Sequence, residues 1–429
     1  MDSFFGVSRN ASSYRKEIFA GVGTFLTMAF IIAVNPMFLA DAGIPFAAGF
    51  MATILATVIG TLIMGLWANW PVAVAPGMGL NAYFAYGLVL GQQFSWQQAL
   101  AAVFVASVLF FLFSLSRARS WLIGAIPRDL QAGITAGIGL FLVMIGLQGM
   151  GVVADDPDTL LRLGAINTPQ MLLGLAGLMV MAGLAARGIR GGVLLTILGL
   201  SAIGWGSGLA EFGGVFGTPP VASAAFSLDF SQLASFGFLS VVFVLFFLDF
   251  FDTTGTLTGI AGIAGKRKED GRIENLDRAV LADTGASIVG SLLGTSSMTT
   301  YLESATGIRD GGRTGLTAVT VAALFLCCLF LEPLFSSIPA FATAPALVFV
   351  GAGFLAPLRN LDWEDVTVGV PVMLMAILMP LTFSIAAGIA IGFLAYVLIH
   401  VLAGGWQKIN AGTWVITVFG CLWLAASTL

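Results

Sequence analysis

The sequence predicts an all-α membrane protein that crosses the bilayer many times, with its segments in two groups of seven. Three observations lead to this prediction: the composition, the series of long apolar windows and the distribution of basic residues. Hydrophobic residues make up 58% of the 429 residues and charged residues only 9%, against roughly 25% charged in an ordinary soluble domain. A water-soluble fold of this size would need polar residues that this chain does not have.

The apolar windows divide the chain into fourteen expected spans, since a hydrocarbon core of about 30 Å needs about 20 apolar residues per helix. The first seven windows lie at 18–40, 46–68, 74–91, 97–115, 131–150, 170–187 and 191–209. The second seven lie at 238–260, 279–294, 296–309, 314–331, 343–358, 366–384 and 385–403. A polar stretch at 210–236 separates the two groups. The apolar stretch at 412–428 fits either a further span or an interfacial helix.

The basic residues test this layout. With the N-terminus in the cytoplasm, all of the 18 Lys and Arg residues except Arg162 fall on the cytoplasmic side, which is the asymmetry of the positive-inside rule. Arg162 lies in a loop that also carries Asp155, Asp156 and Asp158. If one span were miscounted, the basic residues after it would fall on the opposite side of the membrane. The sequence therefore predicts a multi-pass protein of the cytoplasmic (inner or plasma) membrane with a cytoplasmic N-terminus.

Two expected spans, the third of each group of seven, are unlike the rest. One contains PVAVAPGMGLNAYF, with two prolines and the polar Asn81, and the other reads GTSSMTTYLESATG and is too short and polar for one membrane helix. Both would leave unpaired backbone groups in lipid, so such segments belong inside the protein or along a cavity. Interrupted segments at matching places in two halves indicate the binding site of an inverted-repeat transporter. The alternative is a kinked helix and a re-entrant loop without a functional role.

Four acidic residues fall within expected spans: Asp249, Asp252, Asp283 and Glu303. A charge at a helix centre costs about 2.5–3.5 kcal/mol on insertion scales, so such residues usually mark a substrate or proton pathway. Glu303 follows two threonines and a tyrosine on an interrupted segment, and Asp252 precedes the small polar run TTGT. We therefore favour these two for contact with a substrate or proton. Asp249, one turn earlier, is a further candidate, and Asp283 is interpreted as a residue that caps or bridges helices.

The residue types at this site suit a small, neutral ligand rich in N–H and C=O groups. Asn81 adds an amide that both donates and accepts, whereas two carboxylates would repel an inorganic anion. No Walker-type phosphate loop, H-E-x-x-H motif or basic patch with interleaved aromatics occurs. Transport driven by an ion gradient is therefore expected, without a cofactor, a metal or a nucleic-acid partner. Three cysteines are interpreted as packing residues: Cys327, Cys328 and Cys421.

Four motifs carry a family resemblance. They are NPMFLADAGIP after the first span, APGMGLNAYFAYG in the third, DFFDTTGTLTG in the eighth and GTSSMTTYLESATGI in the tenth. Together they resemble the AzgA-like purine permeases, the hypoxanthine/guanine/adenine branch of the nucleobase–cation symporter superfamily, over about residues 14–405. The resemblance implies the fold of the uracil and xanthine transporters, with fourteen spans as a seven-plus-seven inverted repeat. Short extended strands in spans 3 and 10 would pair at the midplane.

The resemblance also implies two domains and a tail. The core domain would comprise 14–115 and 238–331, and the gate domain 131–209 and 343–403. The apolar C-terminal tail would follow at 404–429. Members of this fold are often homodimers, so a second copy of the chain is an expected partner beside the lipid bilayer.

The implied substrate site draws on both halves of the chain. An acidic residue followed three positions later by glycine matches Asp252 rather than Asp249, and the pattern Thr-Thr-aromatic-x-Glu ends at Glu303. The implied substrate-binding residues are Asp252, Glu303, Asn81, Ala82, Thr300, Leu302 and Thr256. Ala82 and Leu302 would offer backbone groups. Thr256 stands where the uracil branch has a histidine, so proton coupling would rest on Asp252, Glu303 or Asp249.

These observations predict a secondary active transporter that imports purine nucleobases (adenine, guanine and/or hypoxanthine) by proton symport. The core would move against the gate like an elevator. Sodium is an open alternative as the coupling ion, and the sequence does not rank the purines. An anion transporter or exchanger of the same architecture is the first alternative. A membrane channel or enzyme that uses the carboxylates as an ion ring or as acid–base groups is the second.

Overall fold

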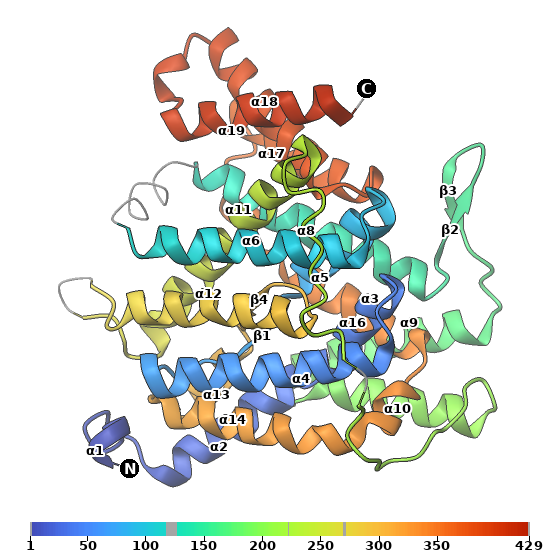
Figure 1. Cartoon of the computed structure of the whole chain (residues 1–429). Helices are drawn as coiled ribbons and strands as arrows, with labels where there is room; N and C mark the ends of the chain where they lie inside the picture. Colours follow the sequence, from blue (N-terminus) through green and yellow to red (C-terminus); the bar gives the residue numbers. More distant parts are fainter. Residues whose placement is uncertain (1, 117–126, 222, 269–271, 428–429) are drawn as a thin grey trace.

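Helices account for most of the chain in the computed structural model, which describes residues 2–116, 127–221, 223–268 and 272–427 (Figure 1). Among these residues, nine helical stretches are long and apolar enough to cross a membrane. The chain is a multi-pass, mostly helical membrane protein, as the composition predicts. The count of fourteen stays a prediction, because several expected spans are short or interrupted helices that length and composition alone do not identify. Arg117 and Arg119, two of the basic residues expected on the cytoplasmic side, lie outside the described residues.

The elements of the first half precede the long connection that follows α10. They are α1 (Asp2–Phe5), α2 (Tyr14–Met28), α3 (Ile31–Asp41), α4 (Phe46–Ile63), η1 (Met64–Ala68), β1 (Val74–Pro76), α5 (Met78–Ala82), η2 (Tyr83–Gly91), α6 (Trp96–Ser114), α8 (Arg128–Gly149), β2 (Val153–Asp156), β3 (Leu160–Leu163), α9 (Pro169–Ala186) and α10 (Gly192–Gly206).

The elements of the second half follow the long connection after α10. They are α11 (Phe236–Ile263), α12 (Leu276–Leu293), β4 (Met298–Thr300), α13 (Ser304–Arg309), α14 (Gly315–Cys327), η3 (Cys328–Leu331), α15 (Glu332–Ser336), α16 (Ala340–Gly353), η4 (Ala356–Asn360), α17 (Val366–Leu381), α18 (Ile385–Leu402), η5 (Trp406–Lys408) and α19 (Ala411–Ser427).

Polar capping residues determine where some of the long helices begin. Ser95 and Gln98 form a reciprocal capping box at the start of α6, with bonds of 3.2 and 3.1 Å. The Ser235 hydroxyl accepts a hydrogen bond from the Phe238 N–H at the start of α11 (3.1 Å). Such bonds satisfy backbone donors that a helix leaves free in its first turn. Gly294, with φ of +97°, ends α12 and turns the chain into the extended segment that follows.

The interrupted segments of the two halves meet as an antiparallel pair of strands between the helices (Figure 1). Val74 lies opposite Thr300 and Pro76 opposite Met298, and every residue of both strands is buried. The Tyr301 hydroxyl also donates to the Pro76 carbonyl (2.6 Å). The strands expected in spans 3 and 10 are therefore confirmed. Their pairing satisfies inside the protein the backbone groups that lipid could not.

The helices pack in two groups, which we call the core group and the gate group. In the core group, α2, α4 and α6 pack with α11, α12, α13 and α14. In the gate group, α8, α9 and α10 pack with α16 and α17, and α18 packs on α17. The two groups meet where α10 contacts α2 and where α5 contacts α8. The strand pair belongs to the core group, so its polar residues lie on one of the two bodies.

The C-terminal helix α19 contacts both groups. Gly420 lies against Ala390 of α18, where an added Cβ would be 3.0 Å from the Ala390 Cβ. The Phe419 ring lies with its centroid 4.1 Å from that of Phe243 on α11. The apolar stretch at the end of the chain is thus packed against the protein along α18 and α11.

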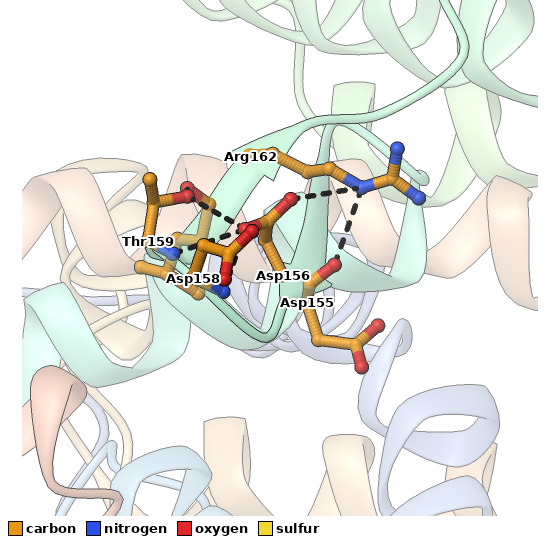
Figure 2. A network of polar contacts seen from close by, with 6 residues as sticks. Asp155, Asp156, Asp158, Thr159 and Arg162 are labelled. Atoms are coloured by element: carbon orange, nitrogen blue, oxygen red, sulfur yellow. Dashed lines mark hydrogen bonds and ion pairs between the residues drawn. The ribbon is translucent and has the colours of Figure 1, made fainter.

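The loop that carries Arg162 folds as the hairpin of β2 and β3 (Figure 2). The Asp156 carboxylate accepts hydrogen bonds from the backbone N–H groups of Thr159 and Asp158, both at 3.0 Å. These two hydrogen bonds lower the pKa of Asp156, and the bond from Thr159 has the larger effect. The Arg162 Nε lies 3.3 Å from the Asp155 carbonyl and 3.8 Å from the Asp156 carboxylate. The Asp156 side chain is therefore engaged in shaping the hairpin.

Candidate functional site

Two aspartates of α11 face the extended chain around β4. Residues three apart lie on a similar face of a helix, and residues two apart lie on the same face of a strand. Asp249 and Asp252 therefore meet Ser297 and Thr299. The Ser297 hydroxyl donates to the Asp249 carboxylate and the Thr299 hydroxyl donates to the Asp252 carboxylate, both at 2.8 Å.

The two aspartates differ in their exposure. The Asp249 side chain is only 2% exposed, whereas Asp252 is exposed. A ligand can therefore reach the Asp252 carboxylate, while Asp249 is enclosed by the core group. Asp252 therefore stays the candidate for contact with a ligand.

Helix α12 packs against β4. The Ser287 hydroxyl donates to the Met298 carbonyl (2.7 Å), accepts from the Met298 N–H (3.0 Å) and lies 3.3 Å from the Ser297 hydroxyl. On the same helix, the buried Asp283 accepts a hydrogen bond from the Thr253 hydroxyl of α11. Asp283 thus bridges α12 and α11, as the sequence suggested for it.

Glu303 lies between β4 and α13. Its backbone carbonyl accepts a long hydrogen bond from the Thr27 hydroxyl (3.4 Å), and its side chain lines a cavity of about 180 Å³. Thr306, Phe30 and Phe349 also line this cavity. The cavity therefore lies between the core group, which supplies Glu303, and the gate group, which supplies Phe349. Among the expected site residues, Glu303 alone is in its lining.

Asn81 lies at the other end of the strand pair, on α5. Its carbonyl oxygen accepts a hydrogen bond from the Ser296 hydroxyl, and its amide nitrogen is buried without a hydrogen-bond partner in the described part of the chain. The buried Thr300 hydroxyl is also without one there. An unsatisfied buried polar group costs about 1–3 kcal/mol. Both groups can therefore gain from a ligand that accepts and donates hydrogen bonds.

The other expected residues have different positions. Ala82 is the last residue of α5 and is buried, and Thr256 is buried one turn after Asp252 on α11. The Leu302 side chain is 54% exposed, and its backbone carbonyl accepts from the Ala305 N–H (2.9 Å). Sequence reasoning missed Ser296, Ser297 and Ser287. The run of hydroxyl residues in TSSMTT is the signal that points to two of them.

The electrostatics of the site are those of a cluster of acidic groups. Asp252 lies within electrostatic range of Asp249, Asp283 and Glu303. Within the described ranges, no Lys or Arg forms an ion pair with any of the four, and no group of three or more His, Cys, Asp or Glu residues could hold a metal ion. The arrangement can accept hydrogen bonds from N–H groups and can take up protons.

The chain is similar to known membrane permeases along nearly its whole length. The model of the Permease family matches residues 15–391. Adenine permease AdeP of Escherichia coli (strain K12) is 39% identical over 405 residues, which cover 94% of this chain and 91% of AdeP. Guanine/hypoxanthine permease PbuO of Bacillus subtilis (strain 168) is 39% identical over 427 residues, which cover 97% of this chain and 98% of PbuO.

Among solved structures, the transmembrane domain of a cyanobacterium bicarbonate transporter, BicA, has a similar fold. The TM-score is 0.66 at 18% sequence identity, over 90% of this chain and 97% of that chain. At this identity the likeness concerns the fold alone. The likeness supports the coarser part of the fold prediction, a mostly helical, multi-pass membrane fold.

Proposed function

We propose that this chain, which belongs to the Permease family, is a secondary active transporter that imports purine nucleobases by proton symport. Its full-length relatives include adenine and guanine/hypoxanthine permeases, so the resemblance in the four motifs is confirmed and the chain is a transporter rather than an enzyme. The proposed location is the cytoplasmic membrane, with the N-terminus in the cytoplasm.

The observation that carries the proposal is the pair of carboxyl groups beside the strand pair. Asp252 is held by Thr299 and stays exposed, and Glu303 lines the cavity between the two groups of helices. Carboxylates accept hydrogen bonds from the ring and exocyclic N–H groups of a purine. The Asn81 amide and the Thr300 hydroxyl would supply the donors that the ring nitrogens and carbonyl oxygens require.

Proton coupling would use the same carboxyl groups. A carboxylate within the membrane is costly unless a hydrogen-bond donor or a proton compensates its charge. With the base bound, either Asp252 or Glu303 would also carry the co-transported proton, and the base and the proton would be released together into the cytoplasm. The enclosed Asp249 would then receive or pass a proton through Ser297. This scheme uses only residues of the core group.

The proposed movement is an elevator-like displacement of the core group against the gate group. Asp252, Asn81 and the strands belong to the core group, whereas the opposite wall of the cavity belongs to α9, α10 and α16. A base bound to the core group would therefore travel with it.

In the membrane we expect a homodimer, which chemical cross-linking before solubilisation would detect.

An anion transporter is the competing function, because BicA shares the fold. The acidic cluster argues against it, since like charges would repel an anion. We therefore retain the purine proposal.

Uptake of radiolabelled bases into cells without endogenous carriers tests the proposal. Adenine, guanine or hypoxanthine is expected to accumulate, and a protonophore is expected to abolish accumulation. Xanthine, uracil and bicarbonate serve as comparison substrates. If no purine accumulates, or if bicarbonate alone does, the substrate assignment is wrong. Accumulation that follows a sodium gradient and survives the protonophore would overturn proton coupling.

A further inference from the structure

An ion pair connects the two groups of helices. The Arg190 Nη2 lies 2.5 Å from the Asp310 Oδ1. Arg190 belongs to the turn between α9 and α10 of the gate group, and Asp310 directly follows α13 of the core group. The ion pair of Arg162 with Asp156, by contrast, lies within the β2–β3 hairpin.

This pair lies at the edge of the cavity that Glu303 lines. Ile189 and Gly191, the neighbours of Arg190 in sequence, both line the cavity. Thr306, one turn before Asp310, lines it as well. Helix α13 thus follows the cavity wall from Glu303 at one end to Asp310 at the other.

The carboxylate half of the pair is fixed in place. The Asp310 side chain is 16% exposed, and its Oδ2 is buried without a hydrogen-bond partner in the described residues. It lies against Gly23 of α2, where an added Cβ would be only 2.8 Å from Oδ2. Arg190 is therefore the main compensation for a largely buried charge.

The arginine half approaches from the gate group on a turn pressed against α2. Gly191 has φ of +69°, a conformation that glycine adopts without strain, and an added Cβ would lie 3.1 Å from the Leu26 carbonyl. The Arg190 side chain is 52% exposed. The turn and the ion pair together close one edge of the cavity.

We infer that Arg190 and Asp310 form a latch that holds the gate group against the core group at this edge of the cavity. The inference rests on the proposed function, because a core group that slides along the gate group must break the pair. Since Glu303 and Asp310 flank the two ends of α13, a displacement of α13 at the site would reach the latch. The basic residues around the pair predict that this is the cytoplasmic face.

Thiol accessibility tests the latch without any nucleobase. Ala185 lines the cavity, so Ala185→Cys is the reporter in a chain whose three native cysteines are replaced by alanine. A membrane-impermeant maleimide is added to inside-out vesicles and, separately, to intact cells. Arg190→Ala and Asp310→Asn are each expected to raise the labelling rate about two- to fivefold from one side, the change expected for a partly exposed ion pair. The double variant should rise no further, because both changes remove one interaction.

Two matched variants control for general loosening. Arg190→Lys keeps the charge and should label within the range of the parent reporter. Arg187→Ala removes an exposed arginine of the same turn that forms no ion pair in the described structure and should leave the rate unchanged. Unchanged rates in both latch variants, increases that multiply in the double variant, or an equal increase in Arg187→Ala would overturn the latch. Base uptake is measured in parallel, so a wrong substrate and a wrong latch give separate results.

Discussion

The hydrogen bond from Thr299 to Asp252 offers the sharpest test of the site. Thr299→Val keeps the shape of the side chain but removes the hydroxyl that donates at 2.8 Å. Thr299 is 4% exposed, so water does not readily replace that donor. A hydrogen bond to a charged group contributes about 1.5–3 kcal/mol, and 1.4 kcal/mol corresponds to a tenfold change in an equilibrium constant. The KM for the transported base should therefore rise about 10- to 100-fold.

The assay is initial-rate uptake over a range of base concentrations, with the amount of protein in the membrane measured for each variant. Ser297→Ala is the matched change beside the enclosed Asp249. We expect this variant to lower thermal stability and to leave KM within about threefold of the parent. The reason is that it removes packing and a hydrogen bond at a place away from the ligand. Thr258→Val is the control, since that hydroxyl donates only to backbone carbonyls of its own helix. A KM for Thr299→Val close to that of Thr258→Val would refute the reasoning. An equal rise in Ser297→Ala would refute the distinct roles of the two aspartates.

Three further predictions address transport, packing and pH. Asp252→Asn and Glu303→Gln should each abolish uptake while the protein still reaches the membrane; normal uptake in either variant removes that residue from the site. Gly315→Ala should destabilise the protein by about 1–3 kcal/mol, because its Cβ would lie 1.8 Å from the Gly65 carbonyl oxygen; the melting temperature in detergent should fall, whereas Gly262→Ala, with nothing within 4 Å, should not lower it. Burial lowers the pKa of Lys266, which lies outside the membrane-spanning segments. Burying the charged lysine therefore lowers the free energy of unfolding at neutral pH. This loss becomes smaller as the pH rises toward the pKa of lysine in the unfolded chain. Lys266→Met should raise the melting temperature most near pH 7 and least near pH 10; a gain that grows with pH would contradict this.

Much of the fold follows from the sequence because it depends on local patterns. Apolar length gives the positions of the helices, and the prolines and glycines of the third span predict its interruption. The ends of the elements depend on residues outside the apolar windows. The expected span at 314–331 consists of α14 and η3, and α15 follows directly at Glu332, with Pro333 in its first turn. Apolar windows alone do not detect such a break.

The carboxyl groups and Asn81 could be picked out as candidates, since a charged or amide residue inside an apolar run is visible in the sequence. Their partners could not, because hydroxyl residues are common and their orientation depends on strand geometry. Arg190 and Asp310 are separated by 120 positions. Nothing in the local sequence of either one indicates that they meet.

The two aspartates of α11 have different surroundings because residues along a helix and residues along a strand repeat at different distances. Three residues of helix rise about 4.5 Å, and two residues of strand rise about 6.6 Å, so each carboxylate meets its own hydroxyl rather than sharing one. The strand places Ser297 deeper, against Ser287 of α12, and Thr299 toward the exposed Asp252. Asp249 is therefore enclosed with the support of the strand, while Asp252 is presented to the ligand. Because Asp249 is enclosed and bonded to Ser297, whereas Asp252 is exposed, we assign Asp249 to proton transfer and Asp252 to the base.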